Sequence, residues 1–180
     1  MNKPSLEQLK YPVGPFEFQP PVAAETLASW IDAIALFPSR LDEAIANMPQ
    51  KALEWPYRPK GWNIRQVIHH CADSHINALI RVKLALTEEQ PTIKPYAEHL
   101  WAELPDMMAP IEESLWILKG LHSRWERLLR NLGKDHLQKT FVHPEHGKVF
   151  TLEEAIAMYA WHSNHHLAHV KQALAYRGEF

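Results

Sequence analysis

The sequence predicts an all-α protein: a four-helix bundle with an extended N-terminal arm and a small β-hairpin before the last helix. Three observations lead to this fold class. Four long segments place apolar residues at intervals of three and four positions, which is helical spacing. Most of the 14 prolines and 6 glycines fall between these segments, where they separate one helix from the next. One short segment near the end instead places β-forming residues on both sides of a turn.

The whole chain, residues 1–180, is predicted to form a single domain. A chain of 180 residues buries roughly 70% of its unfolded surface around one core, so it needs no metal or disulfide merely to fold. A hydrophobic share of 46% and 7 tryptophans are typical of a globular protein rather than a disordered one.

Charge and cysteine content argue against several classes of protein. A formal net charge of −2 gives no long-range attraction for phosphates, so we expect no nucleic-acid partner. No stretch approaches 18 apolar residues and the N-terminus lacks a signal-peptide core, so we expect no membrane partner and a cytoplasmic location. The single cysteine, Cys71, cannot form an internal disulfide, which suits a reducing compartment and excludes a CxxC motif.

The first elements are predicted from prolines and apolar spacing. Residues 1–22 contain five prolines, which prevent a regular helix, so this segment is predicted to be an extended arm lying over the body of the protein. From about Ala23 the apolar positions follow helical spacing, and the pattern continues as far as Met48. Pro38 interrupts this stretch and is predicted either to kink one helix or to begin another.

The second and third long helices have clear boundaries. Asn63 is a predicted N-cap, and Gln66 can reach back to complete a capping box. That helix ends before residues 91–108, which are predicted to form a structured connection long enough to cross the bundle, with a helical fragment near its middle. The third helix spans Glu112–Leu132 and is predicted to end at a left-handed cap on Gly133.

The last two elements are a hairpin and a helix. The segment TFVHPEHGKVFT is predicted to form two short strands joined by a turn at residues 144–147. Thr151 and Glu154 form a second predicted capping box, which begins the last helix; that helix runs to Gly178.

Histidine is unusually abundant, and its spacing is informative. In an α-helix His162 and His166 lie about 40° apart, one turn apart on one face, as metal-binding histidine pairs do. His165 and His169 form a second pair that overlaps the first within an arc of about 100°. Seven of the 12 histidines lie in two predicted helices: His69, His70 and His75 in one, and His162, His165, His166 and His169 in the other.

Two imidazoles need a third ligand from another element to bind a transition metal well. His70 lies at the edge of the apolar stripe of its helix and can point inward. Three neutral nitrogens from two helices leave a coordination position open, which is the arrangement of a catalytic zinc site. Such a site can activate water or hold a thiolate, and nickel or another divalent ion that binds imidazole is compatible with the same ligands.

Several of these residues also have purely structural explanations. A lone histidine on an apolar face is usually a hydrogen-bonded core residue. Asp73 could orient a ligand imidazole or act as a base, but it has an equal claim to be an ordinary acid on a helix surface. We expect surface, core or hydrogen-bonding roles for His69, His75, His99, His122 and His136. We expect core roles, rather than a substrate platform, for Trp62, Trp101, Trp116, Trp125 and Trp161.

Four stretches of the chain, in order, resemble the YfiT-like branch of the DinB superfamily: YPVGPFEFQP, WPYRPKGWNIRQVIHHCADSHINALIRVKLALTEE, PTIKPYAEHLWAEL and HPEHGKVFTLEEAIAMYAWHSNHHLAHV. The resemblance runs from Tyr11 to the end of the chain and is most specific over residues 61–89 and 159–170. It implies a DinB-like four-helix bundle in which three histidines hold one zinc or nickel ion, usually within a homodimer.

The resemblance also implies which histidines are the ligands. Carried onto this sequence, they are His70, His162 and His166, so the first of the two overlapping pairs is preferred. No departure from the family pattern removes a ligand. The departures are Cys71 where a leucine is expected, Asn63 where threonine or serine is common, and Asn164 where relatives carry another histidine.

Members of this branch are described as metal-dependent hydrolases, so the resemblance implies an enzyme whose metal activates water against a small-molecule substrate. Some similar proteins are instead S-transferases, in which the metal activates a low-molecular-weight thiol such as bacillithiol, mycothiol or a glutathione-like cofactor. Fold and ligands are compatible with both activities. A helical module that binds metal without catalysis is a third alternative.

Overall fold

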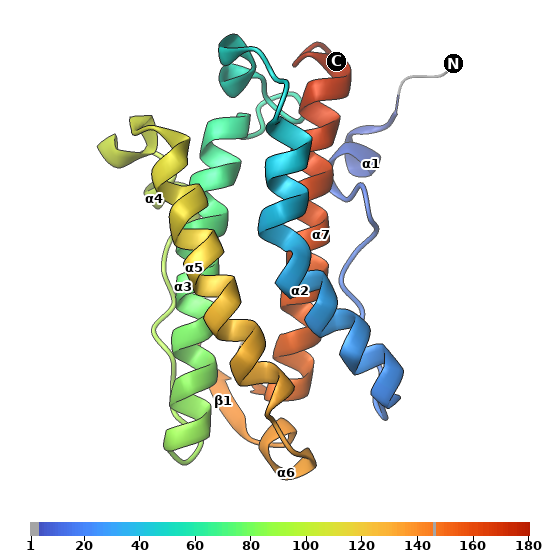
Figure 1. The fold of residues 1–180 in the computed structure, drawn as a ribbon, viewed down its shortest axis with the longest axis vertical. Coiled ribbons are helices and arrows are strands. Elements are labelled where there is room, and N and C mark those ends of the chain that lie inside the picture. The colour runs from blue at the N-terminus through green and yellow to red at the C-terminus, as the bar shows by residue number, and fades with distance from the viewer. Residues whose placement is uncertain (1–3, 146) are drawn as a thin grey trace.

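A computed structural model describes residues 4–145 and 147–180, which form a four-helix bundle (Figure 1). In it, α2 packs against α5 and α7, and α3 packs against the same two helices. α2 and α7 run in one direction, whereas α3 and α5 run in the other (Figure 1). The predicted all-α bundle is confirmed. Its long helices are α2 (Ala24–Ile45), α3 (Ile64–Thr87), α5 (Ile111–Arg130) and α7 (Leu152–Tyr176).

The N-terminal arm lies over the body of the protein, as predicted, and it is anchored to α7 by side chains of that helix. The indole Nε1 of Trp161 donates to the carbonyl of Gly14 at 3.0 Å. One detail of the prediction was wrong, because the arm contains a short helix, α1 (Leu6–Lys10). Ser5 and Gln8 form a reciprocal capping box at its start, in a stretch free of proline.

Pro38 lies inside α2, which continues through it as one helix. The prediction that it begins a new helix is therefore excluded. Proline has no N–H, so the carbonyl of Ile34, four residues earlier, loses its usual helical partner. This carbonyl is buried in the middle of the bundle, and another side chain must satisfy it.

The predicted start of α3 is confirmed, since Asn63 and Gln66 form both hydrogen bonds of the capping box. A joint containing the 3-10 helix η1 (Gln50–Glu54) precedes it. After α3, the chain crosses from one end of the bundle to the other, as predicted (Figure 1). This connection contains α4 (Glu98–Trp101) and the 3-10 helix η2 (Pro105–Met108).

The predicted left-handed cap on Gly133 was wrong. Helix α5 is already closed at Asn131: the N–H of Asn131 donates to the carbonyl of Leu128, and the N–H of Leu132 donates to the carbonyl of Leu129. Gly133 has φ −81° and precedes the short helix α6 (Lys134–Leu137). A glycine just after a periodic stretch therefore served as the start of the next turn rather than as the end of the previous helix.

The hairpin before α7 is confirmed. Strands β1 (Thr140–His143) and β2 (Lys148–Thr151) pair antiparallel, and the turn residue His146 lies outside the described residues. The predicted capping box at α7 is half formed. Thr151 accepts from the N–H of Glu154 at 3.1 Å, but the Glu154 side chain pairs with Lys148 instead of returning to the cap.

The apolar core is divided into two clusters along the length of the bundle. One contains Ile34, Trp125 and Ile156, and the other contains Phe37 and Leu167. Each of α3, α5 and α7 contributes to both clusters and carries histidine between its two contributions: His75 on α3, His122 on α5, and His162, His165 and His166 on α7. A polar layer built largely of imidazoles therefore separates the two halves of the core.

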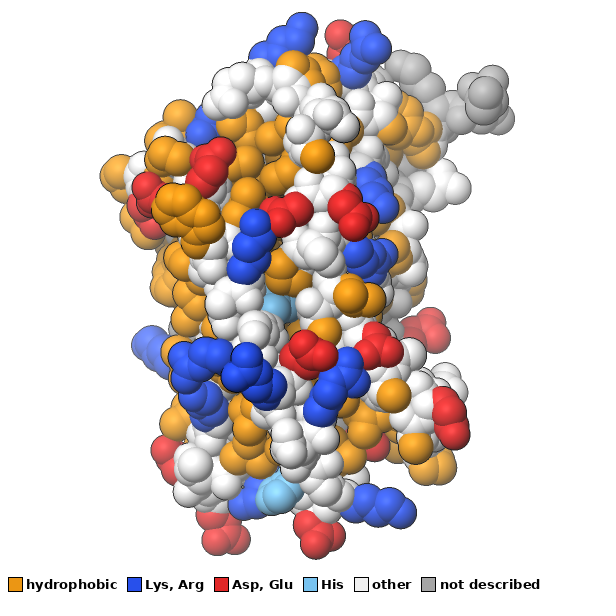
Figure 2. All heavy atoms as spheres, in the orientation of Figure 1, with side chains coloured by type: hydrophobic (Ala, Val, Ile, Leu, Met, Phe, Trp, Pro, Cys, Tyr) orange, Lys and Arg blue, Asp and Glu red, His pale blue; other side chains and the backbone are white. Residues whose placement is uncertain are grey.

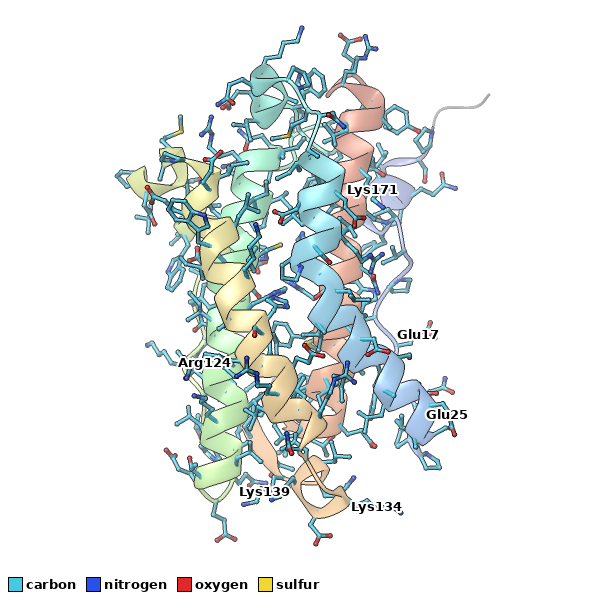
Figure 3. All side chains as sticks on the ribbon, viewed as in Figure 1. Glu17, Glu25, Arg124, Lys134, Lys139 and Lys171 are labelled. Carbon is cyan, nitrogen blue, oxygen red and sulfur yellow. The ribbon has the colours of Figure 1, made fainter. Side chains whose placement is uncertain are left out.

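Charged side chains lie on the outside. On the face shown in Figure 2, lysine and arginine alternate with aspartate and glutamate, and histidine reaches the surface only in small areas. Among the described helices, none combines the length and the apolar character needed to span a membrane. Figure 3 labels six of the outward-pointing charged residues: Glu17, Glu25, Arg124, Lys134, Lys139 and Lys171.

Candidate metal centre

The three predicted ligands come together between α3 and α7. His70 projects from α3, and His162 and His166 project from one face of α7. One nitrogen from each imidazole lies within 4.8 Å of the others, so this group could hold a metal ion. The Nε2 atoms of His70 and His162 are 3.4 Å apart.

Helix geometry explains the convergence. His162 and His166 are one turn apart, and their ring centroids lie 4.4 Å from each other. Because α3 packs directly against α7, the His70 ring reaches both of them, with centroid distances of 5.4 Å to His162 and 4.8 Å to His166. The Trp62 ring also contacts the His70 ring, with their centroids 4.7 Å apart.

The donor set fits a divalent ion in charge, and the separation of two of its nitrogens matches that of a zinc site. Burial lowers the pKa of His70 to about 4, and burial together with the neighbouring imidazoles lowers the pKa of His162 and His166 well below the usual value. All three are therefore neutral at pH 7, as metal ligands must be. Two nitrogens bound tetrahedrally to one zinc ion at about 2.0–2.1 Å lie about 3.3–3.4 Å apart, and this matches the His70–His162 separation of 3.4 Å.

The three candidate ligands line a cavity of about 450 Å³. Trp62 and Trp161 contribute aromatic walls, and Arg58 and Lys60 bring two positive charges from the loop before α3. Glu98, from α4, also lines the cavity, and burial is the main reason that its pKa is raised. The site therefore combines a group of three histidines that could hold a metal ion with apolar and cationic walls.

The second overlapping pair, His165 and His169, has a different position. Among the described residues neither belongs to the group that could hold a metal, although both line the cavity. The His165 ring stacks on Trp161 at 4.3 Å. His169 stacks on Tyr57 at 3.7 Å, and its Nε2 donates to the carbonyl of Lys10 in the arm at 3.0 Å.

His75 and His122 were predicted to have core or hydrogen-bonding roles, and they have both. His75 Nε2 lies 3.0 Å from Nδ1 of His162, and His75 Nδ1 lies 2.8 Å from Nε2 of His122. The Nδ1 of His122 lies 2.6 Å from the carbonyl oxygen of Ile34, the carbonyl that Pro38 leaves without its helical partner. Burial lowers the pKa of His122 to about 4.

Asp73, the candidate base, is half-buried on α3 and is not among the described residues that line the cavity. Burial, and then repulsion from Asp106, raise its pKa to about 6. A base with a pKa near neutrality suits acid–base chemistry. Because it does not line the cavity, its role as a base stays a prediction.

Cys71, beside His70 in the sequence, is buried in the core cluster that contains Phe37. Burial raises the pKa of its thiol, so it is an apolar packing residue rather than a thiolate.

Sequence reasoning placed five tryptophans in the core, but only Trp125 is fully buried there. Trp62 and Trp161 line the cavity, and Trp101 and Trp116 are exposed. The aromatic and basic residues of WPYRPKGW were the available signal for the cavity walls. Helical spacing alone could not reveal this, because it does not distinguish a core face from a face that borders a cavity.

Three imidazoles from two neighbouring helices converge beside a cavity. The fold and the site therefore place the protein in the class of helical bundles with a candidate metal centre. The chain belongs to the DinB superfamily, because the model of that family matches residues 33–170.

Relatives with similar sequences cover almost the whole chain. Proteins from Bacillus cereus (strain 03BB102) and Bacillus thuringiensis subsp. konkukian are each 50% identical over 165 residues, which is 92% of this chain and 95% of theirs. Both are provisionally named metal-dependent hydrolases. The solved structure of YfiT from Bacillus subtilis matches with a TM-score of 0.91 and 42% identity, over 95% of this chain and 98% of YfiT. YfiT is provisionally described as a metal-dependent hydrolase with an unusual four-helix bundle topology.

Proposed function

We propose that the protein is a metal-dependent hydrolase of a small-molecule substrate, with one zinc or nickel ion per subunit held by His70, His162 and His166. The observation that carries this proposal is the set of three neutral imidazoles that converge beside a cavity of about 450 Å³. A divalent ion in such a site supplies Lewis acidity, which polarises a substrate carbonyl and makes water more acidic. The names of the relatives support the same class of reaction.

The surrounding residues suit the binding of a substrate with an apolar part and an anionic part. Trp62 and Trp161 offer flat apolar surfaces, while Arg58 and Lys60 attract negative charge. Glu98 lines the cavity with a raised pKa, so it is better placed to act as a general base than Asp73, the candidate from the sequence, which does not line the cavity.

The test is hydrolysis by protein purified without a histidine tag, stripped of metal and reloaded with zinc or nickel. A panel of small esters and amides should be cleaved only by the loaded protein. The His70→Ala variant should fold yet lose metal and activity. If the untagged protein binds neither ion and gains no thermal stability from them, the proposal is wrong.

A small-thiol S-transferase is the second candidate, and the mixed walls of the cavity favour it. A polar thiol cofactor needs charged contacts, whereas its electrophilic partner needs an apolar surface, and Arg58 and Trp161 lie in the same cavity. The loaded protein should then conjugate a low-molecular-weight thiol to an electrophilic probe without cleaving esters. A module that binds metal only for stability would unfold when His70 is replaced and would show neither reaction.

We also propose a homodimer, which is supported by apolar surface around α4, η2 and the start of α5. Met108 and Trp116 are both 69% exposed, and Leu100 and Leu104 are exposed nearby. Light scattering should give twice the mass of one chain, and Trp116→Lys should reduce it to one. A monomeric wild-type protein would contradict this proposal.

A further inference from the structure

A continuous line of buried hydrogen bonds joins the backbone of α2 to the candidate metal centre. It starts at the carbonyl of Ile34, passes through His122 on α5 and His75 on α3, and reaches His162 on α7. His75 is 0% exposed and His122 is 1% exposed. All four long helices therefore contribute one link, and we call His122, His75 and His162 the histidine chain.

The carbonyl end determines the direction of every bond in the chain. A carbonyl oxygen can only accept, so Nδ1 of His122 must carry the proton at this 2.6 Å contact. In a neutral imidazole the other nitrogen is then an acceptor, so Nε2 of His122 accepts from Nδ1–H of His75. By the same rule Nε2 of His75 accepts from Nδ1–H of His162. The Nε2 of His162 is left with a free lone pair.

The opposite direction conflicts with the fixed acceptor. Ser74 Oγ lies 3.4 Å from Nε2 of His162 and could accept a proton from that nitrogen. Each imidazole along the chain would then reverse, and Nδ1 of His122 would present a lone pair to the carbonyl of Ile34. Two acceptors at 2.6 Å repel each other. The Ser74 hydroxyl can rotate and donate instead, so it does not oppose the first direction.

We propose that His75 and His122 are positioning residues that hold His162 in its Nδ1–H tautomer, so that its Nε2 lone pair points at the metal. The anchor is the Ile34 carbonyl, which has no helical partner because Pro38 has no N–H. This inference rests on the proposed role of His162 as a ligand. A histidine that binds a metal through one ring nitrogen commonly donates the N–H of the other to a carbonyl or carboxylate. Here two further histidines, His75 and His122, lie between His162 and the carbonyl.

A shorter series of contacts of the same kind supports His166. The carbonyl of Lys10 accepts from Nε2–H of His169 at 3.0 Å, which leaves Nδ1 of His169 as an acceptor. That atom faces Nδ1 of His166 at 3.4 Å. A proton on Nδ1 of His166 leaves its Nε2 free as a ligand, so the second histidine of α7 obeys the same rule with one intermediate imidazole.

The direct test is ¹⁵N NMR of histidine-labelled, metal-free protein, because ring nitrogens with and without a proton have distinct shifts. We expect His75, His122 and His162 all to carry the proton on Nδ1. An Nε2–H tautomer at His75 or His122 would overturn the inference. The measurement needs no enzymatic activity, so it separates a failure of this inference from a failure of the proposed function.

The functional test compares buried histidines on one helix. His75→Phe keeps a ring but removes both nitrogens, and should weaken zinc binding about 10- to 100-fold in chelator competition. His75→Gln, whose amide retains a donor and an acceptor, should recover part of that loss. His69→Phe is the matched control. His69 is also buried on α3, but it hydrogen-bonds to Ser114 and Ala109, which are not part of the histidine chain. Equal zinc affinity in the His75→Phe and His69→Phe variants, both folded by circular dichroism, would contradict the proposal.

Discussion

The two α7 ligands are supported by two differently built regions. Behind His162, the histidine chain ends on a carbonyl of α2 inside the bundle. Behind His166, a single imidazole, His169, ends on the carbonyl of Lys10 in the arm. The first support is made by the same helices that form the core. The second depends on a segment outside the bundle, so we expect its disturbance to affect the fold less.

Acid should have the largest effect, and it acts mainly through buried imidazoles such as His122. The pKa of His122 is about 4 in the folded protein and near 6.5 when unfolded, so between these values the unfolded chain binds more protons. The contribution of His122 to stability is then constant above pH 6.5 and falls as the pH drops toward 4. Each such histidine contributes about 1.4 kcal/mol per pH unit in this window.

Urea denaturation of metal-free protein at several pH values measures this slope. In this pH window the His122→Phe variant should take up about one proton fewer on unfolding than the wild-type protein does. An identical slope in both proteins would mean that His122 is not held neutral by the fold.

Truncation should separate the two supports in stability. His122→Ala leaves the Ile34 carbonyl without a partner inside the core and opens a cavity, at a cost of about 3–4 kcal/mol. His169→Ala also removes a buried ring, but it leaves the carbonyl of Lys10, a partly exposed residue that water can reach, so we expect a smaller loss of about 2–3 kcal/mol. Denaturation of both variants without metal gives the two values. Equal losses would show that the arm-side support is as much part of the core as the other.

Removal of the arm should weaken metal binding less than replacement of a residue in the histidine chain. A variant lacking residues 1–10 loses the Lys10 carbonyl but keeps every contact of the histidine chain. We expect a folded bundle whose affinity for zinc falls by a factor of about 10 or less, which is the lower end of the usual effect of residues that hydrogen-bond to metal ligands. A loss of zinc affinity as large as that of the His75→Phe variant would show that the arm and the histidine chain contribute equally to metal binding.

Pro38→Ala should give the smallest change and the most specific one. The new N–H can donate to the Ile34 carbonyl, but a carbonyl has two lone pairs, so His122 can still donate as well. We expect a change in stability of about 1 kcal/mol or less and a measurable shift of the His122 Nδ1 resonance. An unchanged resonance would show that the proline does not influence the anchor.

The outline of the fold could be predicted because it depends on local rules. Capping at Asn63, apolar spacing and proline placement predicted the long helices and the hairpin. Errors occurred where one local signal has two meanings. Gly133 follows a helix but begins another, and the arm contains a proline-free turn that its composition concealed.

The candidate site could be predicted only in part, for a similar reason. The spacing of His162 and His166 is a property of one helix, so it is visible in the sequence. The links from His75 to His122 and from His122 to Ile34 join different helices. No periodicity within a helix encodes such contacts, since they depend on how the helices pack.

The polar layer between the two apolar clusters also restricts how the helices can slide along one another. Apolar contacts tolerate a shift of one turn, about 5.4 Å, because one aliphatic side chain can replace another. The bonds from Ile34 to His122, His75 and His162 would all be lost in such a shift, leaving buried polar groups without partners. Imidazoles in the middle of this bundle thus select one alignment of its four helices, as a single buried asparagine does in a coiled coil.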